Sequence, residues 1–148
     1  MTTYYFSYGS YMSPEKMLAS IPSARLIGTG RLPGYRLVFT AFSELRKRVG
    51  ADIIPASGES VWGIVYEIPE ESLVEMDRNK VYPVLYDRLE VTTEVGVQSV
   101  TAWTYALVDK TDSGHVPDPA YLQLLTDLTR THGFPEAYVE RLAVSSKR

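Results

Sequence analysis

The amino-acid sequence predicts an α+β fold in which short strands and a few helices share one chain. Two observations predict it. β-Branched and aromatic residues gather in runs of strand length, and capping residues and prolines mark helix starts between and after these runs. The expected strands cover residues 4–8, 24–32, 35–42, 60–68, 86–93 and 99–108, and the expected helices cover residues 13–21, 70–79, 118–131 and a segment from about 135.

The first expected strand leads into a loop. Residues 4–8, Tyr-Tyr-Phe-Ser-Tyr, favour an extended chain, and Gly9-Ser10 allows a sharp turn. Ser13 can cap the helix that follows, and Pro14 suits its first turn. Such a strand, turn and helix start aim several backbone N–H groups at one point, which suits a carboxylate or phosphate. An ordinary edge strand and turn has the same pattern.

The next segments predict a hairpin, a loop and a central strand. Pro33-Gly34 between two strand-like runs predicts a tight hairpin turn. Residues 43–58 predict a loop, and the basic cluster near its start predicts a solvated face. The apolar, β-branched segment 60–68 predicts a central strand, and Gly63 inside it marks a close approach by another part of the chain.

A helix is expected from about residue 70 to Asn79, with acidic residues in its first turn. The spacing of Leu73, Met76 and Lys80 places all three on roughly one face, so Lys80 projects from the apolar side at the helix end. A hairpin and two closing helices complete the pattern. The first of these helices begins at Asp118-Pro119 with a broad leucine stripe.

The composition restricts the classes of function. The 148 residues, 45% of them hydrophobic and 22% charged, fit one globular domain, residues 1–148. A formal charge of -3 gives no general attraction to nucleic acid, and the lack of cysteine excludes thiol chemistry and Cys-based zinc sites. No apolar run approaches the roughly 20 residues of a membrane helix, so we expect a cytoplasmic protein without membrane or nucleic-acid partners. Neither His115 nor His132 has a partner at metal-ligand spacing, and we expect no metal or cofactor.

Residues 4–12 read Tyr-Tyr-Phe-Ser-Tyr-Gly-Ser-Tyr-Met, residues 58–66 contain Val-Trp-Gly-Ile-Val-Tyr, and residues 76–86 begin Met-Asp-Arg-Asn-Lys-Val. These segments resemble, in the same order, the signature motifs of the γ-glutamylcyclotransferase-like family, which includes the γ-glutamylamine cyclotransferases and the AIG2-like group. The resemblance covers nearly the whole chain. It implies a compact mixed β-barrel of about six strands with a few packed helices.

The resemblance also implies a substrate site. In the family, the backbone of the first loop binds the carboxylate end of a γ-glutamyl substrate, which implies that Tyr8, Gly9 and Ser10 bind a small molecule with a carboxylate end. Tyr11 stands where the family has Asn, and we expect it to lie in the same pocket.

Lys80 stands where the family has its catalytic glutamate, and Val81 replaces the following glycine. In the family reaction the glutamate removes a proton from the α-amine, which attacks the γ-carbonyl and releases an amine and 5-oxoproline. A protonated lysine cannot be that base, and it repels the substrate ammonium. The resemblance adds Tyr105 to the catalytic residues and Tyr86 to the substrate-binding residues, although both also suit a packed aromatic core.

Three interpretations of Lys80 stay open. In an enzyme with altered chemistry, Lys80 is a base, an imine-forming nucleophile or an anchor for a second anionic group, or Asp77, Asp87 or Glu67 takes over as base. The alternative is a catalytically inactive relative that binds a metabolite or a partner protein. In the third, Lys80 is a solvated lysine at a helix end. The sequence favours a small-molecule enzyme acting on a γ-glutamyl amine or amide, or a related amino-acid-derived substrate, and leaves the oligomeric state open.

Overall fold

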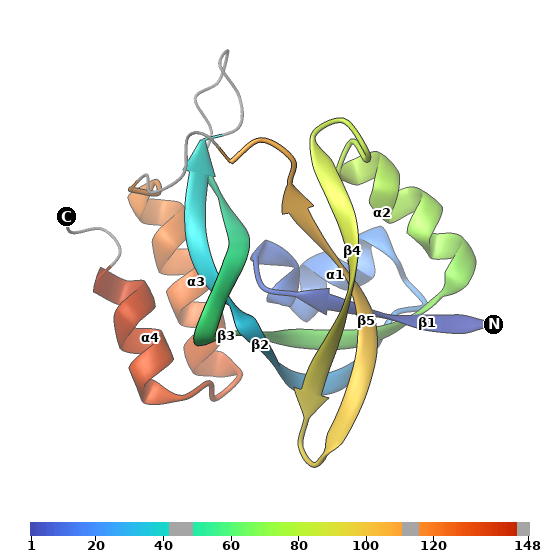
Figure 1. Cartoon of the computed structure of the whole chain (residues 1–148). Helices are drawn as coiled ribbons and strands as arrows, with labels where there is room; N and C mark the ends of the chain where they lie inside the picture. The colour runs from blue at the N-terminus through green and yellow to red at the C-terminus, as the bar shows by residue number, and fades with distance from the viewer. Residues whose placement is uncertain (42–48, 111–115, 145–148) are drawn as a thin grey trace.

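The computed structural model describes residues 1–41, 49–110 and 116–144. Five strands close a mixed barrel in the order β1-β3-β2-β4-β5, and helices pack around it (Figure 1). The elements are β1 (Thr2–Ser7), a 3-10 turn (Ser10–Met12), α1 (Pro14–Ser20), β2 (Arg25–Ala41), β3 (Val49–Pro69), a 3-10 turn (Glu70–Ser72), α2 (Leu73–Asn79), β4 (Tyr86–Val95), β5 (Gln98–Leu107), α3 (Pro119–Thr131) and α4 (Glu136–Ala143). The predicted barrel with packed helices is confirmed, with five strands in the described residues where about six were expected.

The strand count differs because β2 and β3 are long. The predicted hairpin at Pro33-Gly34 is wrong: β2 continues through it, with Gly34 at φ 86° and a shift of register against β3. A glycine at positive φ in a bulge bends a strand without reversing it. The predicted loop at 43–58 is wrong from Val49 onward, because β3 begins there and pairs with β2. The rest of that loop lies outside the described residues.

The first strand crosses the barrel in close contact with β3. β1 pairs antiparallel with β3 and parallel with β5, where Tyr5 lies opposite Trp103. A Cβ atom added to Gly63 would lie 2.3 Å from the carbonyl oxygen of Ser7 and 2.7 Å from the ring of Phe6. The close approach that Gly63 predicted is therefore with β1, and it fixes the end of β1 from which the first loop departs.

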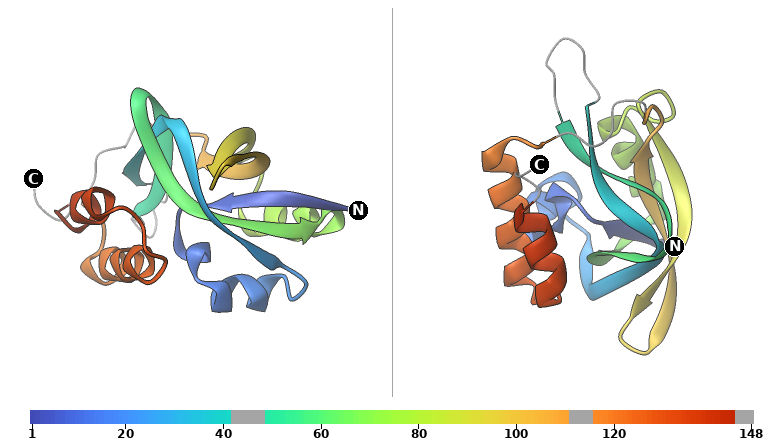
Figure 2. Two further views of the ribbon diagram at one scale, coloured as in Figure 1. Left: turned by 90° about the horizontal axis from the view of Figure 1, so that it is seen from below. Right: turned by 60° about the vertical axis from the view of Figure 1, so that its left-hand side comes forward.

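The helices cover different sides of the barrel. α3 and α4 lie side by side next to the paired strands β2 and β3, and α2 lies on the opposite side of the barrel (Figures 1 and 2). Asp118 caps α3 by accepting the Ala120 N–H at 2.8 Å, and Gly133 at φ 72° follows the helix end. In the described part of the chain, no helix is long and apolar enough to span a membrane.

Candidate active site

A cavity of about 570 Å³ opens between the loop after β1, the start of β3, the ends of β4 and β5, and the facing ends of α2 and α3. Its size lies in the range of small-molecule sites. Six tyrosines give the wall apolar faces and hydroxyl groups: Tyr5, Tyr8, Tyr11, Tyr86, Tyr105 and Tyr121. The cavity brings together all the residues that the sequence assigned to the site, namely Tyr8, Gly9, Ser10, Tyr11, Lys80, Tyr86 and Tyr105.

The loop after β1 is held from two sides. The Tyr8 hydroxyl donates to the carbonyl oxygen of Tyr105 at 2.5 Å, and the Tyr66 hydroxyl donates to that of Tyr11 at 2.9 Å. Burial raises the pKa of Tyr8 well above its ordinary value, so this donor keeps its proton. Because the first N–H groups of a helical turn lack intrahelical acceptors, the turn that begins at Ser10 presents donors next to the cavity.

Lys80 closes the C-terminal end of α2, and its side chain faces the cavity. The ammonium lies 4.9 Å from the ring centroid of Tyr86 and 5.4 Å from that of Tyr11. Among the described residues it has no hydrogen-bond or ion-pair partner. Burial first, and the positive charge of Lys16 second, lower the pKa of Lys80 to about 8. This placement argues against a solvated helix-end lysine, and it gives the site an amine that is partly neutral near physiological pH.

Lys16 is a second lysine at the cavity edge, and sequence reasoning did not assign it to the site. Its ammonium donates to the Ser10 hydroxyl oxygen at 2.7 Å and lies 4.9 Å from the Tyr11 ring centroid. It comes close because α1 starts directly after the loop, with Ser13 accepting the Lys16 N–H at 3.3 Å as the predicted cap. Tyr11 therefore contacts two ammonium groups.

A polar cluster ties the end of α2 to the barrel. The Tyr105 hydroxyl donates to Asp77 Oδ1 at 2.6 Å, and the Arg88 guanidinium donates to Asp77 Oδ2 at 2.5 Å. Arg88 also lies 4.9 Å from the ring centroid of Tyr82 and 4.8 Å from that of Trp103. Burial, followed by the hydrogen bond to Asp77, raises the pKa of Tyr105. The hydroxyl of Tyr105 is thus committed to Asp77, while its ring lines the cavity.

The three carboxylates considered as replacement bases lie elsewhere, and none of them lines the cavity. Asp77 is held by Tyr105 and Arg88. Asp87 accepts the Arg88 backbone N–H at 2.9 Å, and Glu67 pairs with Arg25 at 2.6 Å. Lys80 therefore faces the cavity without a competing carboxylate from this set.

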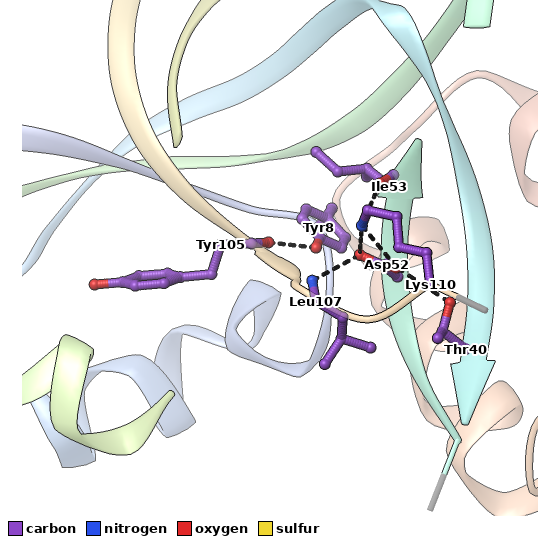
Figure 3. Close-up of polar contacts among 7 residues, drawn as sticks. All are labelled: Tyr8, Thr40, Asp52, Ile53, Tyr105, Leu107 and Lys110. Atoms are coloured by element: carbon purple, nitrogen blue, oxygen red, sulfur yellow. Dashed lines mark hydrogen bonds and ion pairs between the residues drawn. The ribbon is translucent and has the colours of Figure 1, made fainter. Parts of the chain in front are cut away.

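A buried network supports the cavity wall formed by the start of β3 (Figure 3). Asp52 is 0% exposed, and its carboxylate accepts from Thr40 Oγ1 at 3.1 Å, the Leu107 N–H at 3.0 Å and Lys110 Nζ at 2.8 and 2.9 Å. Lys110 also donates to the carbonyl oxygen of Ile53 at 3.0 Å. The network joins β2, β3 and the end of β5, and sequence reasoning missed it because Asp52 fell in a predicted loop.

The start of α3 completes the cavity with Asp118 and Tyr121. The Ala51 N–H donates to the Tyr121 hydroxyl oxygen at 3.3 Å, which fixes α3 against β3. Among the lining residues that the structure describes, Asp118 is the acidic side chain and Lys80 the basic one. Within residues 1–41, 49–110 and 116–144, no group of three or more His, Asp or Glu side chains is arranged to hold a metal ion.

The fold is a closed mixed barrel, and the tyrosine-lined cavity between its loops has the size of a small-molecule site. The chain is therefore a barrel protein with a cavity of small-molecule size. The chain belongs to the γ-glutamyl cyclotransferase, AIG2-like family, whose model matches residues 5–123. It is 27% identical to the γ-glutamylcyclotransferase of Mus musculus over 150 residues, covering 95% of this chain and 77% of the mouse protein. The human γ-glutamylcyclotransferase is 25% identical over 147 residues, covering 93% of this chain and 76% of the human protein. A solved γ-glutamyl cyclotransferase structure matches with a TM-score of 0.86 and 25% identity, covering 96% of this chain and 86% of that one.

Proposed function

We propose that this protein is a cyclotransferase-like enzyme that acts on a γ-glutamyl amine or amide, or a related amino-acid-derived substrate, with Lys80 in the position of the family's catalytic glutamate. Family membership supports the substrate class. The observation that carries the altered chemistry is the placement of Lys80, whose ammonium faces the cavity against two tyrosine rings without a hydrogen-bond partner among the described residues.

The proposal places the substrate along the cavity wall. Its carboxylate end lies at the backbone donors of Tyr8, Gly9 and Ser10, and its carbon chain lies against the rings of Tyr11 and Tyr86. The α-amine and the γ-carbonyl then lie towards Lys80. The positions of these residues around one cavity of about 570 Å³ support this arrangement.

The lowered pKa lets Lys80 take part as a base. With a pKa of about 8, an appreciable fraction of Lys80 is neutral at slightly alkaline pH. Neutral Lys80 accepts a proton from the substrate α-ammonium, and the freed nitrogen attacks the γ-carbonyl carbon. The bond from that carbon to the leaving nitrogen breaks as a proton passes to the leaving amine. The products are 5-oxoproline and an amine, and no water or cofactor is consumed.

Tyr105 has a positioning part in this proposal. Its hydroxyl donates a hydrogen bond to Asp77, which lies three residues before Lys80 on the same helical segment. This contact and the Arg88 contact hold the end of α2 against β4 and β5 and so fix where Lys80 points.

The proposal is tested by mass-spectrometric turnover of γ-glutamyl amines, dipeptides and amides by the wild type, Lys80→Met and Lys80→Glu. We expect the wild type to release 5-oxoproline at a rate that rises with pH through about 8. Loss of a positioned base is expected to lower the rate by about 10²- to 10⁴-fold in Lys80→Met. Lys80→Glu supplies a base of lower pKa, so its remaining activity is expected to extend to lower pH.

Three results would contradict the proposal. Equal turnover by the wild type and Lys80→Met would remove Lys80 from the reaction. A wild type that binds these compounds but releases no product at any pH would indicate a binding protein, and activity gained by Lys80→Glu alone would show that the pocket is intact but serves another substrate.

A further inference from the structure

Lys16 is a charged group beside the cavity that the proposed reaction does not use. Its ammonium is 2.7 Å from the hydroxyl oxygen of Ser10, which it donates to, and 4.9 Å from the ring centroid of Tyr11. Both of these neighbours line the cavity. Lys16 is an exposed residue overall, and the partial burial of its side chain lowers its pKa.

Most basic residues in the described part of the chain pair with a carboxylate, whereas Lys16 and Lys80 have no carboxylate partner among the described residues. Seven basic side chains in the described part of the chain pair with a carboxylate, as Arg25 does with Glu67. Lys16 and Lys80 instead share the ring of Tyr11 and repel each other. Two like charges at one cavity edge without a counter-ion are unfavourable, and an anion bound beside them relieves the repulsion.

The Ser10 hydroxyl adds a donor at the same point. Because its oxygen accepts from Lys16, its own hydrogen is available to a ligand. Lys16 retains further N–H groups for the same ligand, since an ammonium has three donors. An ammonium and a hydroxyl side by side suit a carboxylate oxygen pair.

We infer that Lys16 and Ser10 form a seat for a side-chain carboxylate of the leaving amine, beyond the α-carboxylate that any leaving amino acid carries, so that the preferred substrates are γ-glutamyl conjugates of an amino dicarboxylic acid. This inference rests on the proposed function, which assigns the common carboxylate of the γ-glutamyl part to the loop amides and the α-amine to Lys80. The leaving amine is the part of the substrate without an assigned contact.

The seat also has a consequence for Lys80. An anion at Lys16 offsets the repulsion between the two lysines and makes Lys80 a stronger base in the substrate complex. Among the residues that the structure describes, the other titratable groups that face this space are the tyrosines of the wall and Asp118 at the start of α3. Acidic leaving groups are therefore expected to improve proton transfer to Lys80 as well as binding.

The test compares γ-glutamyl-aspartate with γ-glutamyl-asparagine, which have nearly the same shape and differ by one negative charge. We expect the wild type to favour the aspartate compound by about tenfold in kcat/KM, the size of one charge-assisted hydrogen bond. In Lys16→Met this preference is expected to fall to about one, measured as the ratio of kcat/KM for the two compounds at one pH, so that a change in the basicity of Lys80 common to both compounds cancels. Arg130→Met removes an exposed positive charge far along α3 and is expected to keep the preference.

The alternatives give different results. Equal turnover of the two compounds by the wild type overturns the inference and leaves the proposed function standing. An equal loss for both compounds in Lys16→Met overturns it too, because Lys16 would then hold the carboxylate that all γ-glutamyl substrates share. If neither compound is turned over, the proposed function fails, and calorimetric binding of aspartate and asparagine still tests the seat. Aspartate is then expected to bind about tenfold more tightly to the wild type, and equal binding overturns the seat.

Discussion

Asp52 and Lys80 are both charged side chains within the fold, and the structure treats them in opposite ways. Asp52 is fully buried and accepts hydrogen bonds from Thr40, Leu107 and Lys110. Lys80 faces a cavity and contacts the rings of two tyrosines, with no hydrogen-bond partner among the residues of the described ranges. Lys80 lines the cavity, whereas Asp52 directly follows Ala51, which lines the cavity from the start of β3.

The difference distinguishes a charged side chain that stabilises the fold from one that is available to a ligand. A buried charge whose hydrogen bonds are all made holds elements together and gains little from a ligand. A charge that the fold desolvates but does not pair lowers the stability of the folded chain, and a bound ligand can supply the missing interaction. Removing Lys110 beside Asp52 should therefore lower the free energy of unfolding, and removing Lys80 should raise it.

The largest effect is expected for Lys110→Met, which leaves the buried carboxylate of Asp52 without this cation. Removing one partner of a buried pair typically costs about 3–5 kcal/mol, and because the Lys110 side chain is 33% exposed we expect a loss at the lower end, about 3 kcal/mol, in the free energy of unfolding measured in urea. The matched control is Arg130→Met, which removes an exposed cation whose Asp127 contact is 3.9 Å long, and it is expected to change stability by less than about 1 kcal/mol. Similar losses in the two variants would mean that the Asp52 network contributes no more than a surface pair.

For Lys80→Met we expect the opposite sign. Because the pKa falls from 10.5 to about 8 on folding, the unfolded chain binds more protons between these values, and wild-type stability rises with pH across that window. Below pH 8 the variant is expected to be more stable by about 1–2 kcal/mol, less than the full shift implies because the two ring faces offset part of the burial. Unfolding curves at pH 7 and pH 10.5 check this expectation. A variant less stable than the wild type at pH 7 would show that Lys80 stabilises the fold.

Tyr105→Phe tests whether the Asp77 cluster acts through Lys80. Loss of the hydroxyl leaves Asp77 at the end of α2 held by Arg88 without Tyr105, and we expect about a tenfold fall in kcat with little change in KM, equivalent to about 1.4 kcal/mol. The pKa of Lys80, followed by NMR, is expected to shift as its surroundings loosen, which a purely structural role would not produce. Tyr138→Phe removes a tyrosine hydroxyl on α4 and is the control with unchanged kinetics. Loss of activity without any change in the Lys80 titration would contradict the positioning role.

The smallest effect is expected at Val81, which follows Lys80 at φ 49°, a conformation unfavourable for a β-branched residue. The left-handed conformation costs about 1–2 kcal/mol and glycine loses about 0.5–1 kcal/mol of chain entropy, so Val81→Gly is expected to stabilise by about 0.5–1 kcal/mol. Val84→Gly, at an exposed neighbour without positive φ, is expected to destabilise by a similar amount. Equal thermal shifts in the two variants would show that the conformation of Val81 carries no strain.

Local signals in the sequence predicted much of the fold. Ser13 and Asp118 cap the helices that they were expected to start, because a side-chain acceptor before a helix acts within a few residues. Gly63 marked a close approach correctly, since packing against another strand excludes a side chain there. The seven site residues assigned from the family motifs all line the cavity, whereas other lining residues such as Asp118 and Tyr121 were not assigned to the site.

Features that depend on distant contacts were missed. Pro33-Gly34 looks like a turn, but pairing with β3 on both sides keeps the strand going through a bulge. Asp52 looked like a loop residue because its donors come from Thr40, Leu107 and Lys110, which lie far along the chain. Lys16 carried no signal of its own, because its contact with Tyr11 depends on the turn between them.

The contact at Gly63 makes the site vulnerable to a change outside it. Gly63 does not line the cavity, yet a methyl group there would meet the carbonyl oxygen of Ser7, next to Tyr8 and the loop. Relief of that overlap would move the end of β1 and the loop amides with it. In a screen of random variants, alanine at this position would therefore be scored as a loss-of-function allele, although every side chain around the cavity was left intact.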